Sequence, residues 1–182
     1  MLSEVDMSSC YWVFLVAAMP DSAERNRLIQ LLASGEFYWY LESICNKYDQ
    51  RNYSTLKKSV QIQCLFDKPR RHPLFGALCN EFPELGRFLR YLRSRGPSAL
   101  SQYLNQMEGR FFIDTALPQV WGLDIPCLTL HDGLLVPESA AKQVQELCVN
   151  AAIDHFGFAP SFKITYSPLS TELLSSRVEP ET

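Results

Sequence analysis

The feature that most constrains the fold is the run 129–136, in which two short apolar segments flank the sequence His131-Asp132-Gly133. Both segments are β-prone, and a glycine between them favours a tight reversal of the chain. The run therefore predicts a β-hairpin with His131 and Asp132 at its tip. An aspartate held there by rigid strands can bind a metal ion. The alternative is an Asp-Gly turn chosen for its backbone geometry alone, with His131 capping a strand end.

A second aspartate lies in a short apolar, strand-like segment close to the first residue. Asp6 interrupts this segment, and the small hydroxyl residues Ser8 and Ser9 follow it. Two-metal phosphoryl transfer needs carboxylates from separate elements, which hold two ions about 4 Å apart. Asp6 and Asp132 together can supply them. Taken alone, Asp6 is more simply interpreted as a surface residue.

Between the two aspartates, the segment 53–66 is compatible with a helix and carries the adjacent lysines Lys57 and Lys58. Phe66 follows Lys58 by eight residues, about two helical turns. A lysine can neutralise the phosphates of a nucleotide as a compact charge, and an aromatic ring on the same face can pack against a base. The alternative is a solvated lysine pair on an amphipathic helix.

Taken in order, these segments resemble the motifs of the family A DNA polymerases and of the related single-subunit bacteriophage and mitochondrial RNA polymerases. The first motif, Val-Asp followed by a serine and a helix of apolar residues, is similar to residues 5–8 and the segment after them. The third motif, His-Asp at a hairpin tip, matches His131-Asp132. Gly133 departs from the family pattern, because the DNA polymerases carry a glutamate at this place.

The second motif of the family, an arginine four residues before a lysine, is matched only in part. Lys57 or Lys58 can be the lysine, but Tyr53 or Ser54 stands at the place of the arginine. The helix-like segment before the hairpin is also similar to one in the family, in which a glutamine faces the template. Gln106 would be that glutamine.

The resemblance covers about residues 4–164 and implies an α+β fold like a polymerase palm. A small antiparallel sheet with the motif hairpin would pack on several helices, including partial fingers, and no thumb is present. The implied activity is template-directed transfer of nucleotides to a primer 3′-hydroxyl. Two Mg²⁺ ions, for which Mn²⁺ can substitute, would be held by Asp6 and Asp132. Nucleoside triphosphates and a primer-template are the implied substrates.

The resemblance also assigns roles to the surrounding side chains. Lys58, or Lys57 in the alternative register, would bind the triphosphate, and Phe66 would stack near the new base pair. His131 would orient the primer end. Tyr11 falls where the DNA polymerases of the family place a bulky side chain against the ribose 2′-hydroxyl, which favours DNA over RNA synthesis.

The charge distribution bears on nucleic-acid binding. The net charge of −3 argues against a nucleic-acid partner. Basic residues nevertheless gather in the middle of the chain, and Arg70, Arg71, Arg87 and Arg90 are the candidate contacts to a duplex. The alternative is a solvated helix face, because an apolar stripe runs along the other side of the same helix.

Composition and periodicity set the wider frame. With 182 residues and 47% hydrophobic content, the chain predicts one domain over 1–166 and a disordered tail over 167–182. No apolar stretch approaches the roughly 20 residues that cross a membrane, and no signal peptide is visible, so we expect a cytoplasmic protein with no membrane partner. The six scattered cysteines predict reduced, mostly buried thiols. Helices are predicted over 21–32, 37–48 and 137–157 and from Pro83 and Ser98 onward, and a strand over 161–166.

Two other functions stay open at the level of the sequence. One is a single-subunit type of RNA polymerase. The other is a degenerate palm domain that binds nucleic acid or a replication partner without catalysis, which Gly133 and the missing arginine favour. A catalytic unit without a thumb also predicts a second subunit that supplies one. A small hydrolase built on His131 and Asp132 is disfavoured, because no serine or cysteine stands in a nucleophile-elbow sequence.

Overall fold

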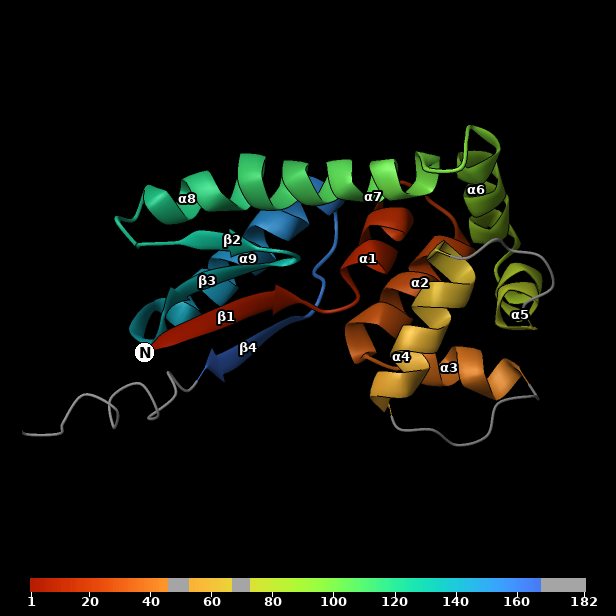
Figure 1. Cartoon of the computed structure of the whole chain (residues 1–182), viewed down its shortest axis with the longest axis horizontal. Helices are drawn as coiled ribbons and strands as arrows, with labels where there is room; N and C mark the ends of the chain where they lie inside the picture. Colours follow the sequence, from red (N-terminus) through yellow and green to blue (C-terminus); the bar gives the residue numbers. More distant parts are fainter. Residues whose placement is uncertain (46–52, 67–72, 168–182) are drawn as a thin grey trace, which may run out of the picture.

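The computed structural model describes residues 1–45, 53–66 and 73–167. This part is an α+β fold, mostly helical, with a small antiparallel sheet at one end and a group of helices at the other (Figure 1). The elements are β1 (Leu2–Met7), α1 (Cys10–Ala17), α2 (Ala23–Ser34), α3 (Phe37–Ile44), α4 (Tyr53–Gln61), η1 (Ile62–Phe66), α5 (Pro73–Glu81), α6 (Pro83–Ser94), α7 (Ala99–Glu108), η2 (Gly109–Ala116), α8 (Leu117–Trp121), β2 (Leu128–Leu130), β3 (Gly133–Pro137), η3 (Glu138–Ala140), α9 (Ala141–Phe156) and β4 (Phe162–Ser167).

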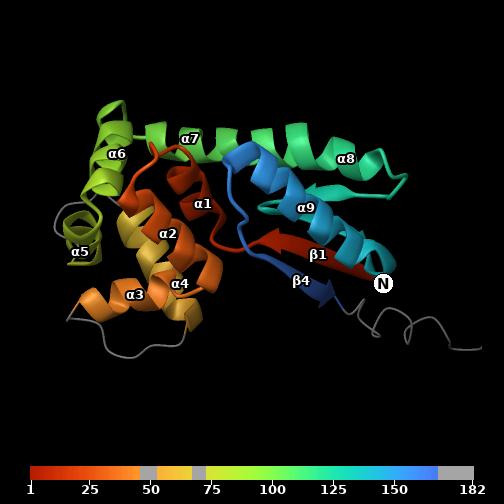
Figure 2. The same cartoon turned by 180° about the vertical axis from the view of Figure 1, so that it is seen from behind.

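The four strands lie in the order β2-β3-β1-β4, and all neighbours are antiparallel. Alternate residues of β1 are buried on the face that α9 covers, as Figure 2 shows from behind: Ser3, Val5 and Met7. Because side chains alternate along a strand, Glu4 and Asp6 lie on the opposite face. No helix covers that face in Figure 1. The predicted strand 161–166 is confirmed as β4, which joins the sheet through β1.

The predicted hairpin is confirmed, but the reason expected for its glycine is wrong. His131 adopts the left-handed conformation at the turn, with φ 49°, whereas Gly133 already belongs to β3. A Cβ atom on Gly133 would lie 2.8 Å from the backbone oxygen of Val5 in the neighbouring strand. Gly133 therefore permits the close approach of β3 to β1, and a carboxylate has no room at this position.

One long helical rod runs above the sheet. It consists of α7, η2 and α8, and η2 is π-helical. The helix predicted from Ser98 onward is confirmed, with Ser98 as its N-terminal flanking residue. The rod extends along the β2 side of the sheet in both views (Figures 1 and 2). The rod therefore extends from the group of helices to the hairpin tip.

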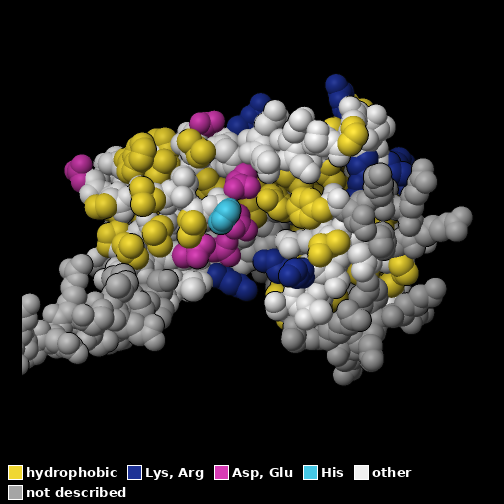
Figure 3. Space-filling model, viewed as in Figure 1, with side chains coloured by type: hydrophobic (Ala, Val, Ile, Leu, Met, Phe, Trp, Pro, Cys, Tyr) yellow, Lys and Arg dark blue, Asp and Glu magenta, His cyan; other side chains and the backbone are white. Residues whose placement is uncertain are grey.

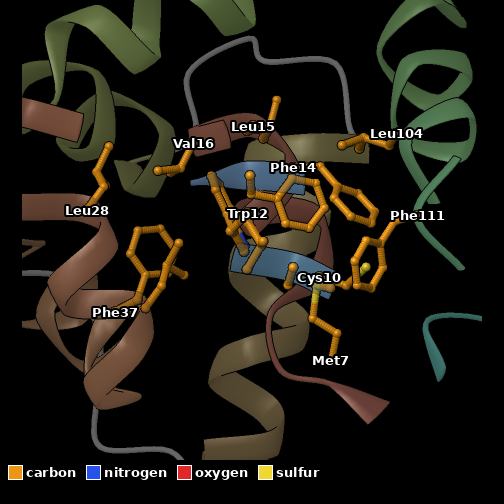
Figure 4. Packing of buried hydrophobic residues seen from close by; sticks show 14 of the residues in the cluster. Met7, Cys10, Trp12, Phe14, Leu15, Val16, Leu28, Phe37, Leu104 and Phe111 are labelled. Atoms are coloured by element: carbon orange, nitrogen blue, oxygen red, sulfur yellow. The ribbon is translucent and has the colours of Figure 1, made fainter. Parts of the chain in front are cut away.

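Helix α1 joins the sheet to the helices and forms the centre of the core. Its residues from Trp12 to Val16 are all buried. The ring of Trp12 lies 4.8 Å from that of Phe37 on α3, and the ring of Phe14 lies 5.8 Å from that of Phe156 on α9 (Figure 4). Aromatic packing on both sides of one helix therefore fixes the sheet and the helices relative to each other.

Most predicted helices are present with shifted ends. The helix predicted over 21–32 is α2, which begins after its N-cap Ser22. The helix predicted over 37–48 is α3, which ends at Ile44 with Cys45 as its C-cap, and residues 46–48 lie outside the described residues. The long C-terminal helix ends before Gly157, which has φ 80°, as predicted. Helix α5 was not anticipated.

Two further expectations concern the chain as a whole. In the part of the chain that the structure describes, no helix is long and apolar enough to cross a membrane. All six cysteines are free thiols, and five of them are buried, as predicted. The predicted tail lies outside the described residues except for the backbone of Ser167.

Candidate functional site

The two predicted metal-binding aspartates meet at the end of the sheet. Asp6 on β1 is the register partner of Gly133, and the N–H of Met7 donates to the backbone oxygen of Asp132 at 3.0 Å. The side chains of Asp6 and Asp132 are hydrogen-bonded to each other. Burial, and then the charge and hydrogen bond of Asp132, raise the pKa of Asp6 to about 7. The carboxyl of Asp6 therefore keeps a proton for part of the time near neutral pH.

Helix α4 brings a lysine to this pair. The charge of Lys57 acts on Asp6 and opposes the rise in its pKa. Lys57 is partly buried, whereas Lys58 is exposed. Of the two registers left open by the sequence, the structure thus places Lys57 beside the aspartates.

A third carboxylate approaches from the helical rod. Glu108, the last residue of α7, lies near Asp132 and His131 and accepts a hydrogen bond from the hydroxyl of Tyr11. Burial and the charge of Asp132 raise the pKa of Glu108, while His131 and the Tyr11 hydrogen bond oppose that rise. From the sequence, Glu108 is interpreted as a solvated or capping carboxylate that could assist the site, because its distance along the chain from both aspartates hides this contact.

An open pocket of about 390 Å³ lies between the hairpin tip and the rod. Tyr11 and Glu108 line it together with Asn105, Gly109, Phe112, Ile113, Thr129 and His131. Tyr11 also contacts Phe66 of η1 edge-on, with ring centroids 5.6 Å apart. Phe66 is half exposed, at 50% of its surface. The two predicted nucleotide-contacting aromatics are therefore neighbours at the mouth of this region.

The surface view shows how these charges are arranged. In Figure 3, acidic side chains surround a histidine at the place of the hairpin tip, and basic side chains lie along the border of the acidic group over β4 and α4. Buried beneath them, the thiol of Cys10 has its pKa raised by burial and by the neighbouring carboxylates. Negatively charged side chains are thus concentrated at the hairpin tip.

Several predicted nucleic-acid contacts are not brought to this site. Arg87 and Arg90 are exposed on α6, at the end of the molecule opposite the sheet (Figure 1). Gln106 is exposed and is not among the pocket residues, although its neighbour Asn105 is. Arg70 and Arg71 lie outside the described residues.

The donor atoms at the hairpin tip are suited to a hard cation. Mg²⁺ prefers oxygen ligands and is usually held by one or two carboxylates together with substrate phosphates. Asp6 and Asp132 supply such a pair, and the hydrogen bond between their side chains brings their oxygens together. Among the described residues, no group of three or more His, Cys, Asp or Glu side chains forms a cage for a metal ion. The pair therefore fits a cation that a bound substrate helps to hold.

No protein-family model matches this chain, and a search of the curated proteins finds no relative. The site is consequently interpreted from its own geometry and chemistry.

Proposed function

We propose that the protein is a template-directed nucleotidyltransferase with a palm and reduced fingers over residues 1–166, which adds deoxynucleotides to a primer 3′-hydroxyl. The observation that supports this most is the meeting of Asp6 and Asp132, from separate elements, beside Lys57. A carboxylate on β1 and one in the β2–β3 turn, with a lysine beside them, form the arrangement that metal-assisted phosphoryl transfer uses.

Each residue has a task in this reaction. When bound, two Mg²⁺ ions would activate the primer hydroxyl and neutralise the triphosphate and its pyrophosphate leaving group. Asp6 and Asp132 would hold these ions, Asp6 after losing the proton that its raised pKa lets it keep near neutral pH. Lys57 neutralises charge on the triphosphate, and His131, exposed beside Asp132, donates a hydrogen bond to the primer end.

The aromatic pair shapes the sugar and base side of the site. Tyr11 is held by its hydrogen bond to Glu108 and by the ring of Phe66. A ring fixed in this way excludes a ribose 2′-hydroxyl by its bulk, which favours deoxynucleotides. Phe66, with half of its surface exposed, offers a face to the new base pair.

One observation favours a second function, a palm that binds nucleic acid or a replication partner without catalysis. Gly133 stands where the DNA polymerases carry a further acidic residue, and the contact of its Cβ position with Val5 leaves no room for one. A site with two carboxylates, one on β1 and one in the hairpin turn, has fewer ligands for metal ions than one with three. Metal binding and nucleotide addition distinguish the two functions.

Primer extension tests the proposal. The wild-type chain, Asp132→Ala and Asp154→Ala are incubated with a labelled primer-template, Mg²⁺ or Mn²⁺, and either dNTPs or rNTPs. Asp154 is exposed on α9 and serves as the matched control. We expect extension with dNTPs by the wild type and the control, and a loss of about 10³-fold or more in Asp132→Ala, because metal ligation supplies several kcal/mol of the barrier.

The other outcomes have distinct meanings. Extension with rNTPs would assign the chain to the RNA polymerase type. Extension that Asp132→Ala retains would contradict the proposed site. Absence of extension together with absence of Mn²⁺ binding would support the non-catalytic palm, whereas Mn²⁺ binding without extension would point to a missing second subunit with a thumb.

A further inference from the structure

Lys163 on β4 occupies a position that the sequence did not single out. The register of β1 and β4 places it directly opposite Asp6, and Thr165 opposite Glu4. Directly opposed residues in a sheet lie on the same face. Lys163 therefore shares the uncovered face of the sheet with Asp6, on the strand edge farthest from the hairpin.

The side chain of Lys163 is available to a ligand. It is exposed, and within residues 1–45, 53–66 and 73–167 it makes no hydrogen bond or ion pair. A long, flexible ammonium in this state can follow a phosphate without first breaking an internal contact. Holding it in place costs side-chain entropy, which a multiply charged ligand can offset.

The location of Lys163 relative to Lys57 indicates what that ligand is. The two lysines come from β4 and α4, and Figure 3 shows basic side chains over both elements on one border of the acidic group. The pocket of Tyr11 and Glu108 lies on the rod side, toward β2. Two cations on the same side of Asp6 fit one extended anion that reaches both.

We infer that Lys163 and Lys57 together bind the triphosphate of the incoming nucleotide, one from the sheet and one from α4. This inference rests on the proposed nucleotidyl transfer. Asp6 lies opposite Lys163 in the sheet and is acted on by the charge of Lys57, so metal ions on Asp6 would meet the same phosphates. Lys163 is thus a substrate-binding residue of the palm that the sequence motifs do not identify.

Equilibrium binding of a labelled nucleotide tests this inference. A deoxynucleoside triphosphate that cannot be hydrolysed between its α- and β-phosphates is titrated, with Mg²⁺ and a primer-template ending in a dideoxynucleotide, into wild type, Lys163→Ala, Lys163→Arg and Lys142→Ala. Lys142 is exposed on α9 and is the matched control. The corresponding nucleoside monophosphate is titrated in parallel.

We expect Lys163→Ala to raise the Kd for the triphosphate about tenfold, the size of one lost charge-assisted contact, and to leave the Kd for the monophosphate within about twofold. Lys163→Arg should recover most of the affinity, and Lys142→Ala should match the wild type. An unchanged Kd in Lys163→Ala, with normal binding by the wild type, would overturn the role of Lys163 alone. No triphosphate binding by the wild type would overturn the proposed function as well. Weaker primer-template binding in Lys163→Ala with an unchanged triphosphate Kd would contradict the assignment to the triphosphate.

Discussion

The two ends of the molecule treat their charged side chains in opposite ways. We call the group α2, α3, α5 and α6 the helical end, and the sheet with α9 and the rod the sheet end. At the helical end, Arg25 donates to the backbone oxygens of Val16 and Phe156 and pairs with Asp21 at 2.8 Å. At the sheet end, the carboxyl groups of Asp6 and Asp132 contact each other through a hydrogen bond.

The rest of the helical end follows the same rule of pairing. Arg27 pairs with Glu81 at 2.7 Å and also contacts Tyr40, while the guanidinium of Arg93 lies over the ring of Phe75. Its basic residues are therefore partly engaged in holding helices together. In the described parts of the chain, no salt bridge involves Asp6, Asp132 or Glu108 at the hairpin tip.

The contrast between paired charges and crowded like charges distinguishes a structural region from a candidate functional site. Paired charges lower the free energy of the folded chain, whereas like charges held together raise it, so a fold keeps them where a ligand compensates. We propose that the crowded carboxylates mark the sheet end as the place of chemistry, whereas Arg87 and Arg90 on α6 lie at the other end (Figure 1).

The largest expected effect on stability lies at the β1–β3 contact. In Gly133→Ala the new methyl group would meet the backbone oxygen of Val5, and the strands would have to separate. We expect a loss of about 1–3 kcal/mol in the free energy of unfolding, measured by urea denaturation. Gly76→Ala is the control at the helical end, because nothing lies within 4 Å of its Cβ position. It should be neutral or gain up to about 1 kcal/mol. Equal stability of the two variants would show that the strands do not approach so closely.

A smaller effect is expected from a pairing at the helical end. The carboxylate of Glu24 accepts the backbone N–H groups of Glu84, at 3.1 Å, and Leu85, at 2.8 Å, and so caps the start of α6. Glu24→Ala should lower the free energy of unfolding by about 1 kcal/mol and leave nucleotide addition unchanged. Glu146→Ala, an exposed change on α9, is the control. A loss of activity at unchanged stability would break the division between the two ends.

The smallest expected effect is a pH dependence that belongs to the sheet end. The pKa of Asp6 is about 7 in the folded protein, against 3.8 ordinarily, so the folded state holds a proton that the unfolded state releases. Stability from this group is present in full below about pH 4 and is lost as the pH rises through 7. The change is about 1 kcal/mol after allowance for solvent screening of a partly exposed group.

Thermal unfolding from pH 5 to pH 8 measures this dependence. Asp6→Asn should flatten the decline of the melting temperature with pH, and Asp154→Asn, on the exposed side of α9, should leave it as in the wild type. The opposite result is a melting temperature that rises from pH 5 to pH 8 in the wild type and does not fall in either variant. It would show that Asp6 is ionised in the folded state.

Much of the sheet end could be predicted because its signals are local. The hairpin, the strand that carries Asp6 and the helix that ends at Gly157 each follow from neighbouring residues. The register of β4 on β1, which brings Lys163 to Asp6, depends on contacts between segments far apart in the chain, and no local pattern encodes it.

Two other features could be predicted only in part, for physical reasons. Glu108 on α7 meets the hairpin tip through a contact between segments far apart in the chain, and a charged residue on a helix is normally interpreted as solvated. The reason for Gly133 differs from the expected one because an Asp-Gly pair is the usual signal of a turn, whereas here His131 adopts the left-handed conformation.

Binding of Mn²⁺ tests the central claim that the crowded carboxylates of the sheet end hold divalent ions. The free ion is measured by electron paramagnetic resonance at pH 8, above the pKa of Asp6, for wild type, Asp6→Asn, Asp132→Asn and Glu81→Gln. Glu81 is the paired carboxylate of the helical end. We predict that wild type and Glu81→Gln bind alike, and that each aspartate variant binds at least about tenfold more weakly, because a charged ligand is worth 1.5 kcal/mol or more. Equal binding by all four proteins, or none by the wild type, would contradict the account.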